Sequence, residues 1–124
     1  MEKVLLAKLI QAEQAISEIT QKELPIDYAE QLMNFKVSAA PFVNEFVNEN
    51  NKIIKEKYAT EKDGKWEFIP ELKEEYETVT KSQLEKQIDL ELPHLSMSVI
   101  KSVNPNFTIS AFTLSHLKNF ILYE

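Results

Sequence analysis

The chain has 124 residues and no cysteine, which excludes a disulfide framework, a thiolate nucleophile and a cysteine-ligated zinc site. Its formal net charge of −6 comes from 20 acidic against 14 basic residues, and every basic residue is a lysine. Arginine provides the forked contacts that dominate guanine and phosphate recognition, so an acidic chain without arginine is not expected to bind nucleic acid.

The length and composition predict a single domain over residues 1–124. No stretch approaches the roughly 18 consecutive apolar residues that a membrane span needs. The first residues do not have the basic region and long apolar run of an export signal, so we expect the protein in the cytoplasm where it is made. The single glycine, Gly64, excludes a glycine-rich phosphate loop.

The first half of the chain has the apolar spacing of two amphipathic helices. Apolar residues recur three and four positions apart over residues 4–19, which predicts the first helix. Asp27 followed by Glu30 has the spacing of a capping box, so a second helix is expected to begin there and to run to Tyr58. Because proline lacks an amide hydrogen, Pro41 predicts a kink or a short break near residues 38–41.

The second half alternates between strand and helix signals. Residues 60–65 around Gly64 predict a turn, followed by a short strand at Trp66 and Phe68 and a third helix that starts at Pro70. Strict alternation over residues 88–92 predicts a half-buried strand.

Residues 97–103 fit either a strand or a helix, and residues 110–123 predict a closing helix with Ser110 as its N-cap. The predicted fold class is therefore α+β and mainly helical, with about four helices, of which the long one is kinked near Pro41. A small two- or three-stranded antiparallel sheet completes it.

The best candidates for chemistry are Asp89, Glu91 and His94, because two carboxylates and an imidazole close in sequence can hold a divalent metal ion. Asp89 and Glu91 also fit the solvated face of an ordinary half-buried strand, and we favour that interpretation. No catalytic residue, metal or cofactor is therefore predicted, and the chain is not expected to be an enzyme.

If the long second helix carries more apolar surface than one small domain can cover, the remainder forms an interaction face. We predict that part of this helix forms a face for a protein partner or for a homo-oligomer. The candidate partner-binding residues are Phe35, Phe42, Phe46, Ile53 and Tyr58.

A set of short motifs in fixed order covers nearly the whole chain. The motifs are Leu24-Pro25, Ile53-Ile54-Lys55, Lys57-Tyr58, Lys62-Asp63-Gly64-Lys65-Trp66, Pro70-Glu71, Glu75-Tyr76, Ile88-Asp89-Leu90, Ile109-Ser110 and Phe120-Ile121. In this order the chain resembles a family of small tailed-phage and prophage proteins of unknown function from low-GC Gram-positive hosts. The resemblance implies a phage setting, with the protein in the host cytoplasm or in the virion, and it implies no catalytic residue.

Three functions follow as hypotheses. The first is a non-enzymatic phage protein that acts through protein–protein contacts, as a minor virion component or an assembly factor. The second is an acidic inhibitor of a host defence or nucleic-acid-handling protein, because complementary charge speeds such encounters. The third is a metal-dependent hydrolase that uses Asp89, Glu91 and His94.

Overall fold

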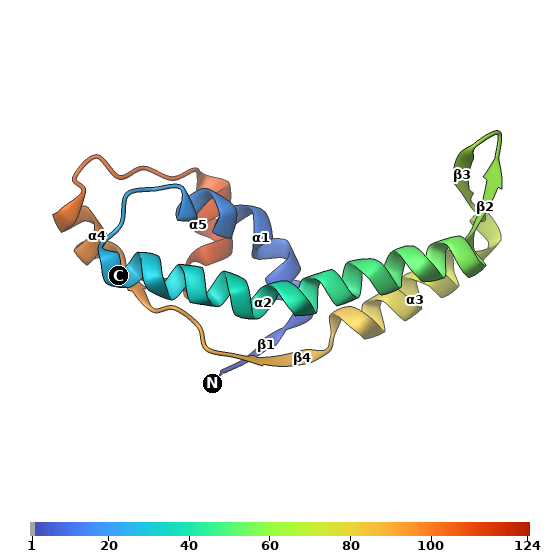
Figure 1. Cartoon of the computed structure of the whole chain (residues 1–124), viewed down its shortest axis with the longest axis horizontal. Helices are drawn as coiled ribbons and strands as arrows, with labels where there is room; N and C mark the ends of the chain where they lie inside the picture. Colours follow the sequence, from blue (N-terminus) through green and yellow to red (C-terminus); the bar gives the residue numbers. More distant parts are fainter. Residues whose placement is uncertain (1) are drawn as a thin grey trace.

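The computed structural model describes residues 2–124, and within them one long helix organises the molecule. Helix α2 (Ile26–Ile53) crosses the whole molecule, and the other elements lie along it (Figure 1). Helices α1 (Leu6–Thr20), α4 (Met97–Val103) and α5 (Ala111–Leu117) gather around its first half. Helix α3 (Lys73–Leu84) lies along its second half, and a β-hairpin stands at its far end (Figure 1).

The N-terminal segment contains a strand that the sequence did not predict. Residues of β1 (Glu2–Leu5) pair antiparallel with β4 (Gln87–Leu90), so that Val4 lies opposite Ile88 and both are buried. Helix α1 then begins at Leu6 and ends at Thr20, close to the predicted end. The expectation of helix from residue 4 was wrong at its start because sheet pairing with β4 holds these residues extended.

Helix α2 has nearly the predicted extent but not the predicted details. It begins at Ile26 with Pro25 as its N-cap, so Asp27 lies in the first turn and caps nothing through its side chain. The expected break near Pro41 is absent, since the helix runs unbroken from Ile26 to Ile53 with Pro41 inside it. A single π-helical turn, Ile54–Tyr58, follows directly.

The chain then reverses in a hairpin made of β2 (Ala59–Lys62) and β3 (Lys65–Phe68). The two turn residues, Asp63 and Gly64, both have positive φ angles of 55° and 76°, the backbone signature of a tight hairpin turn. A 3-10 turn, Pro70–Leu72, leads into α3, which confirms that a helical segment begins at Pro70. The predicted strand at Trp66 and Phe68 is also present.

The last quarter of the chain settles two expectations. The ambiguous residues 97–103 form α4, capped by the side chain of Ser96. Ser110 caps α5 as predicted, but this helix ends at Leu117. Asn119 then adopts a φ of 62°, which turns the chain so that β6 (Leu122–Tyr123) pairs in parallel with β5 (Leu95–Ser96).

The predicted fold class, mainly helical α+β, is confirmed. In residues 2–124 there are five α-helices, one more than predicted. The strands form two separate two-stranded antiparallel sheets and one short parallel pair, where one small antiparallel sheet was expected.

The main hydrophobic core lies where α1 packs against α5 and the first half of α2. Its largest fully buried side chains are Ile19, Leu32, Phe35, Leu95, Ile100, Leu117, Ile121 and Leu122. The second half of α2 meets α3 away from this core. There Tyr76 donates a hydrogen bond to Asn50 Oδ1 at 3.0 Å, and Lys57 pairs with Glu75 at 2.5 Å.

Candidate functional site

The predicted metal ligands do not come together in the structure. Asp89 lies on β4 opposite Lys3 of β1, whereas Glu91 borders a hollow beside α2 that Gln31 and Ser38 also line. Nowhere in residues 2–124 do three or more histidine, cysteine or acidic side chains form a group that could hold a metal ion. Asp89 and Glu91 are exposed, as the solvated face of a strand would be.

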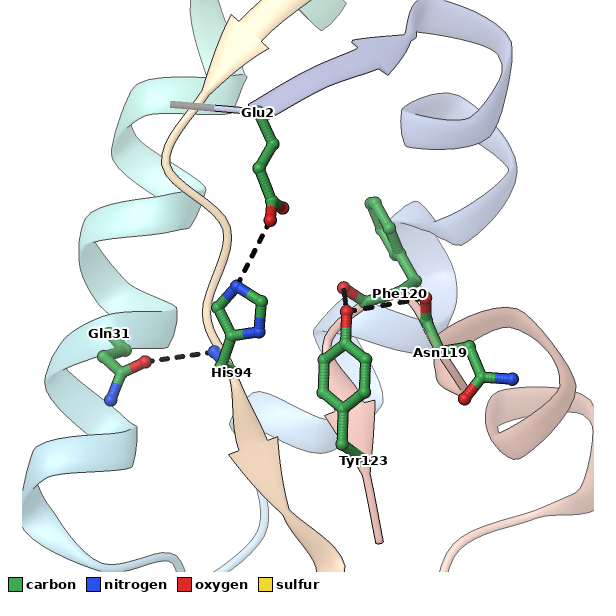
Figure 2. Close-up of polar contacts among 6 residues, drawn as sticks. All are labelled: Glu2, Gln31, His94, Asn119, Phe120 and Tyr123. Atoms are coloured by element: carbon green, nitrogen blue, oxygen red, sulfur yellow. Dashed lines mark hydrogen bonds and ion pairs between the residues drawn. The ribbon is translucent and has the colours of Figure 1, made fainter.

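His94 instead belongs to a polar contact set near the N-terminal strand (Figure 2). Its Nε2 lies 3.5 Å from a carboxylate oxygen of Glu2, and its ring stacks on Tyr123 at 5.2 Å between ring centroids. Its backbone amide donates to Gln31 Oε1 at 3.2 Å. These contacts join β1, β6 and α2 at an exposed surface, which is a structural role.

A second polar set joins α1 to α5. The Glu18 carboxylate accepts hydrogen bonds from the Thr113 hydroxyl and from the backbone amide and hydroxyl of Ser110. The Thr113 bond is the largest cause that lowers the pKa of Glu18 below its ordinary value, partial desolvation opposes it, and the Ser110 bonds add to the lowering. Thr113 is fully buried, so Glu18 satisfies a hydroxyl that water does not reach.

The five predicted partner-binding residues fall into two groups. Phe35 and Tyr58 are 1% and 2% exposed and lie inside the protein, so neither is accessible to a partner in this conformation. Phe42, Phe46 and Ile53 are partly buried. Phe42 and Phe46 pack against the main core and border a shallow groove next to α3. That face of α2 is therefore mostly used for internal packing.

Another apolar face of α2 remains uncovered. The exposed fractions of its large side chains are 77% for Ile26, 58% for Met33, 70% for Val37 and 45% for Val47. They share one side of the helix with the exposed Ala40 and Asn44. We call these six residues the outer stripe: Ile26, Met33, Val37, Ala40, Asn44 and Val47.

The outer stripe has its own helical spacing. From Met33 onward its members are alternately four and three positions apart, the period that keeps residues on one side of a helix. The same signal was present in the sequence. It was missed because the predicted partner-binding residues were chosen mainly for their large aromatic side chains, and these lie on the buried face.

Charged side chains of both signs are exposed along the whole of α2, and its second half has Glu45 and Glu49 as well as lysine. Asp27 and Glu30 are exposed on the first turns of α2, and Lys52 and Lys55 are exposed at its end and in the π-helical turn that follows. The stripe is bordered near its middle by Lys36. Lys36 also lines a groove of about 210 Å³ between α1 and α2, together with Glu13, Ala40 and Asn44.

Two exposed aromatic residues stand on the hairpin at the far end of α2. Trp66 and Phe68 share a face of β3, and the ammonium group of Lys55 lies 5.8 Å from the centre of the Trp66 ring. Phe68 packs edge-on to Tyr76 at 4.9 Å and near Tyr58, so much of its ring has neighbours. The outer stripe is therefore longer than this exposed aromatic pair.

Comparisons with protein-family models, with curated proteins and with solved structures found no match to this chain. The resemblance to a phage family thus stays a prediction. In the part of the chain that the structure describes, no helix is long and apolar enough to cross a membrane.

Proposed function

We propose that this chain is a non-enzymatic, phage-encoded protein that acts through protein–protein contacts, as a minor virion component or an assembly factor. The phage setting rests on the resemblance of its ordered motifs to the phage family. The contact function rests on the outer stripe of α2.

The outer stripe supports a contact function because its exposure is costly to a protein that works alone. Burying apolar surface contributes about 25 cal/mol per Å², so a stripe left in water forgoes that stabilisation. Single exposed apolar residues are common on protein surfaces, but a continuous row along one helix marks an interaction face. Val37 and Met33 make up the centre of this row.

Affinity capture of the tagged chain from infected cells, followed by mass spectrometry, tests this function. We expect phage capsid, tail or assembly proteins among the captured proteins. Val37→Glu should reduce their recovery, because it places a charge in the middle of the outer stripe without disturbing the core. Recovery of the chain alone would contradict the proposal.

A matched control uses a residue of similar chemistry on another element. Val103 on α4 is 60% exposed and lies outside the outer stripe. Val103→Glu should therefore leave the captured proteins unchanged. Equal losses for Val37→Glu and Val103→Glu would show that added charge, and not the stripe, causes the effect.

A second candidate function is the acidic inhibitor of a host protein, and the surface of α3 favours it. Glu74, Glu75 and Glu77 are exposed there, next to the exposed Glu71 of the preceding turn. Charge-driven encounters weaken as salt rises. Capture of a basic host protein that is lost at 0.5 M salt and by glutamate-to-glutamine changes on α3 would favour this function over the first.

A further inference from the structure

We propose that Asp63 is a site of spontaneous backbone modification, at which its side-chain carboxyl condenses with the amide of Gly64 and the chain rearranges to isoaspartate. The site lies in the turn of the β2–β3 hairpin, away from the outer stripe, so the modification is independent of the proposed contact function. The conformation of the turn prepares the two groups for the reaction.

Both reacting residues are accessible at the tip of the hairpin. Asp63 and Gly64 are exposed, and in Figure 1 the loop between β2 and β3 points away from the rest of the molecule. Gly64 lies outside both strands, and its amide donates no hydrogen bond to a backbone carbonyl of residues 2–124. Apart from its two chain neighbours, nothing lies within 4 Å of the position that a Cβ atom would take on Gly64. The nitrogen is therefore unshielded.

The rearrangement has two steps, and neither requires an oxidant or a cofactor. The Gly64 nitrogen attacks the side-chain carboxyl carbon of Asp63, a new C–N bond forms, and the amide proton and the carboxyl hydroxyl leave as water. The product is a five-membered cyclic imide. Water then adds to one of its two carbonyls. Addition at the original backbone carbonyl breaks the old C–N bond and leaves isoaspartate, whereas addition at the other carbonyl restores aspartate.

The backbone of Asp63 is already close to the conformation that closes the ring. In the five-membered imide, the Cβ atom and the nitrogen of the next residue eclipse each other about the Cα–C bond, which for an L-residue means a ψ of about −120°. That ψ with a φ of about 60° describes the first central position of a type II′ turn. Asp63 has a φ of 55°, where most residues other than glycine have a negative φ. Only its ψ has to change.

One peptide flip connects the observed turn to the reactive one. Positive φ angles at both central residues, 55° at Asp63 and 76° at Gly64, identify a type I′ turn, in which ψ of the first residue is about 30°. Rotation of the peptide plane between them gives a type II′ turn, and both types join the strands of a two-residue hairpin. The flip takes φ of the second residue to about −80°, which glycine adopts without steric cost. The strands therefore stay paired while the reacting atoms meet.

The other two aspartates of the chain lack this geometry. Asp27 lies in the first turn of α2 and is followed by Tyr28, and Asp89 lies in β4 and is followed by Leu90. Neither has a positive φ. The regular ψ angles of helix and strand are far from the value that closes the ring, and hydrogen bonds of the helix and sheet hold them there. Both aspartates therefore serve as internal controls.

Isoaspartate changes the end of the hairpin. The chain then runs through the former side chain of Asp63, which adds one atom to the backbone of the turn. Among the residues of β2 and β3 only Ala59 is buried, so these strands depend on the turn more than on a core. We expect the amides of β2 and β3 to exchange faster in the modified chain than in the fresh one.

Peptide mapping of the purified full chain after prolonged incubation at physiological temperature and pH tests the site. Cleavage after Glu61 and Glu67 releases the peptide 62–67, which contains Trp66 and is followed by its absorbance. We expect a second species of identical mass and different elution that an isoaspartate-specific methyltransferase methylates. An imide form, lighter by one water, should accompany it. The peptides that contain Asp27 and Asp89 should each stay a single species.

The synthetic peptide of residues 62–67 measures the effect of the fold. The positive φ that the hairpin gives Asp63 predicts that the folded chain forms isoaspartate at least as fast as this peptide. Slower conversion in the folded chain, or no conversion in either, would overturn the proposal. Equal conversion at Asp27, Asp63 and Asp89 would also overturn it, since the turn would then have no influence.

Two variants test ring closure through the side chain. Asp63→Glu keeps a carboxyl at this position but would need a six-membered ring, so conversion should stop. Gly64→Ala places a methyl group beside the nitrogen and opposes the peptide flip, so conversion should slow. Circular dichroism checks that both variants are folded, and Asp63→Glu gives a result that does not depend on strain at Gly64. Conversion of Asp63→Glu at the rate of the natural chain would contradict the mechanism.

Discussion

Glu18 links residues that are far apart in sequence. Its carboxylate on α1 accepts hydrogen bonds from Ser110 and Thr113 at the start of α5. Ser110 also caps α5 through its own hydroxyl, which accepts from the Thr113 amide at 3.1 Å. The N-cap role of Ser110 was predicted because it depends on local sequence. The role of Glu18 could not be, because its partners are 92 and 95 positions away.

The lowered pKa of Glu18 makes a pH-dependent contribution to stability. A carboxylate whose pKa is lower in the folded state stabilises the protein above the pKa of the unfolded state, about 4.3. That stabilisation is lost as the pH falls through the lowered pKa of the folded state. We expect Glu18→Gln to unfold at a lower temperature than the natural chain at pH 7, with the difference shrinking towards pH 3.

Thermal unfolding followed by circular dichroism between pH 7 and pH 3 measures this difference. Glu13→Gln provides a matched control on the same helix. Glu13 is exposed and takes no part in the hydrogen bonds that join Glu18 to Ser110 and Thr113. A difference between Glu18→Gln and the natural chain that stays constant with pH would contradict the assignment.

The hairpin turn depends on Gly64, whose φ of 76° is unfavourable for other residues. Nothing lies within 4 Å of the position that a Cβ atom would take there, so backbone strain alone opposes a substitution. We expect Gly64→Ala to destabilise the hairpin by about 1–2 kcal/mol, the cost of a left-handed backbone for a residue with a Cβ.

Amide hydrogen exchange of β2 and β3 measures the effect of Gly64→Ala locally. Asp63→Asn is the control, because asparagine tolerates the φ of 55° at that position about as well as aspartate does. Unchanged exchange in Gly64→Ala would show that the turn can adopt another form without cost.

At the level of elements, periodicity predicted the presence of the helices better than it predicted the residues at which they begin and end. The extent of α2 was visible in its buried apolar residues, but its start was set by Pro25 and not by the capping residues Asp27 and Glu30. Strand β4 was predicted from its own alternation. Strand β1 was missed because its residues also fit the apolar spacing of the helix that follows, and β2 was missed because only Ala59 of its four residues is buried.

Pro41 lies inside α2 without breaking it, because packing of Ala39 and Val43 on the core outweighs the loss of one backbone hydrogen bond. Pro41 itself is exposed, so its replacement removes no core contact. We expect Pro41→Ala to stabilise the protein by roughly 1–2 kcal/mol. This is less than the ~3 kcal/mol helix penalty of proline, because proline also restricts the unfolded chain.

Chemical denaturation of Pro41→Ala and of the neighbouring control Ser38→Ala measures this gain. Ser38 is also exposed on α2, and its replacement should change stability by a few tenths of a kcal/mol. A loss of stability in Pro41→Ala would mean that the helix needs a bend at this position.

At the level of the whole molecule, the chain has two packed regions of unequal size. The main core includes residues of α1, α5 and the first half of α2. Tyr58, Phe68 and Tyr76 form a separate aromatic group at the far end, with ring centroids 4.9–6.4 Å apart. Among the hairpin residues Ala59–Lys62 and Lys65–Phe68, Ala59 alone is buried.

Unequal packing predicts unequal local stability. We expect backbone amides of the hairpin to exchange at least about tenfold faster than those of α1, because few buried contacts oppose local opening there. Hydrogen exchange with mass spectrometry resolves the two segments in one experiment. Equal protection of both would indicate that the molecule unfolds as one unit.

The sequence predicted the helix that carries the candidate surface but not the side of that helix. The sequence correctly indicated that α2 carries much apolar surface, but it could not show which side the rest of the chain would cover. The covered side depends on the placement of α1, α3 and α5, which the sequence of α2 does not determine. In the structure these elements cover the side of α2 that has the aromatic residues. The smaller aliphatic residues Met33 and Val37 were left outside.

Because Pro41 has no amide hydrogen, the carbonyl of Val37 is left without its usual helical partner, and α2 is most easily flexed at that level. The stretch from residue 41 to residue 58 is about 25 Å long at 1.5 Å per residue, so a swing of about 10° there displaces the base of the hairpin by roughly 4 Å. A partner that packs along the outer stripe on both sides of Pro41 would restrict this bending of α2.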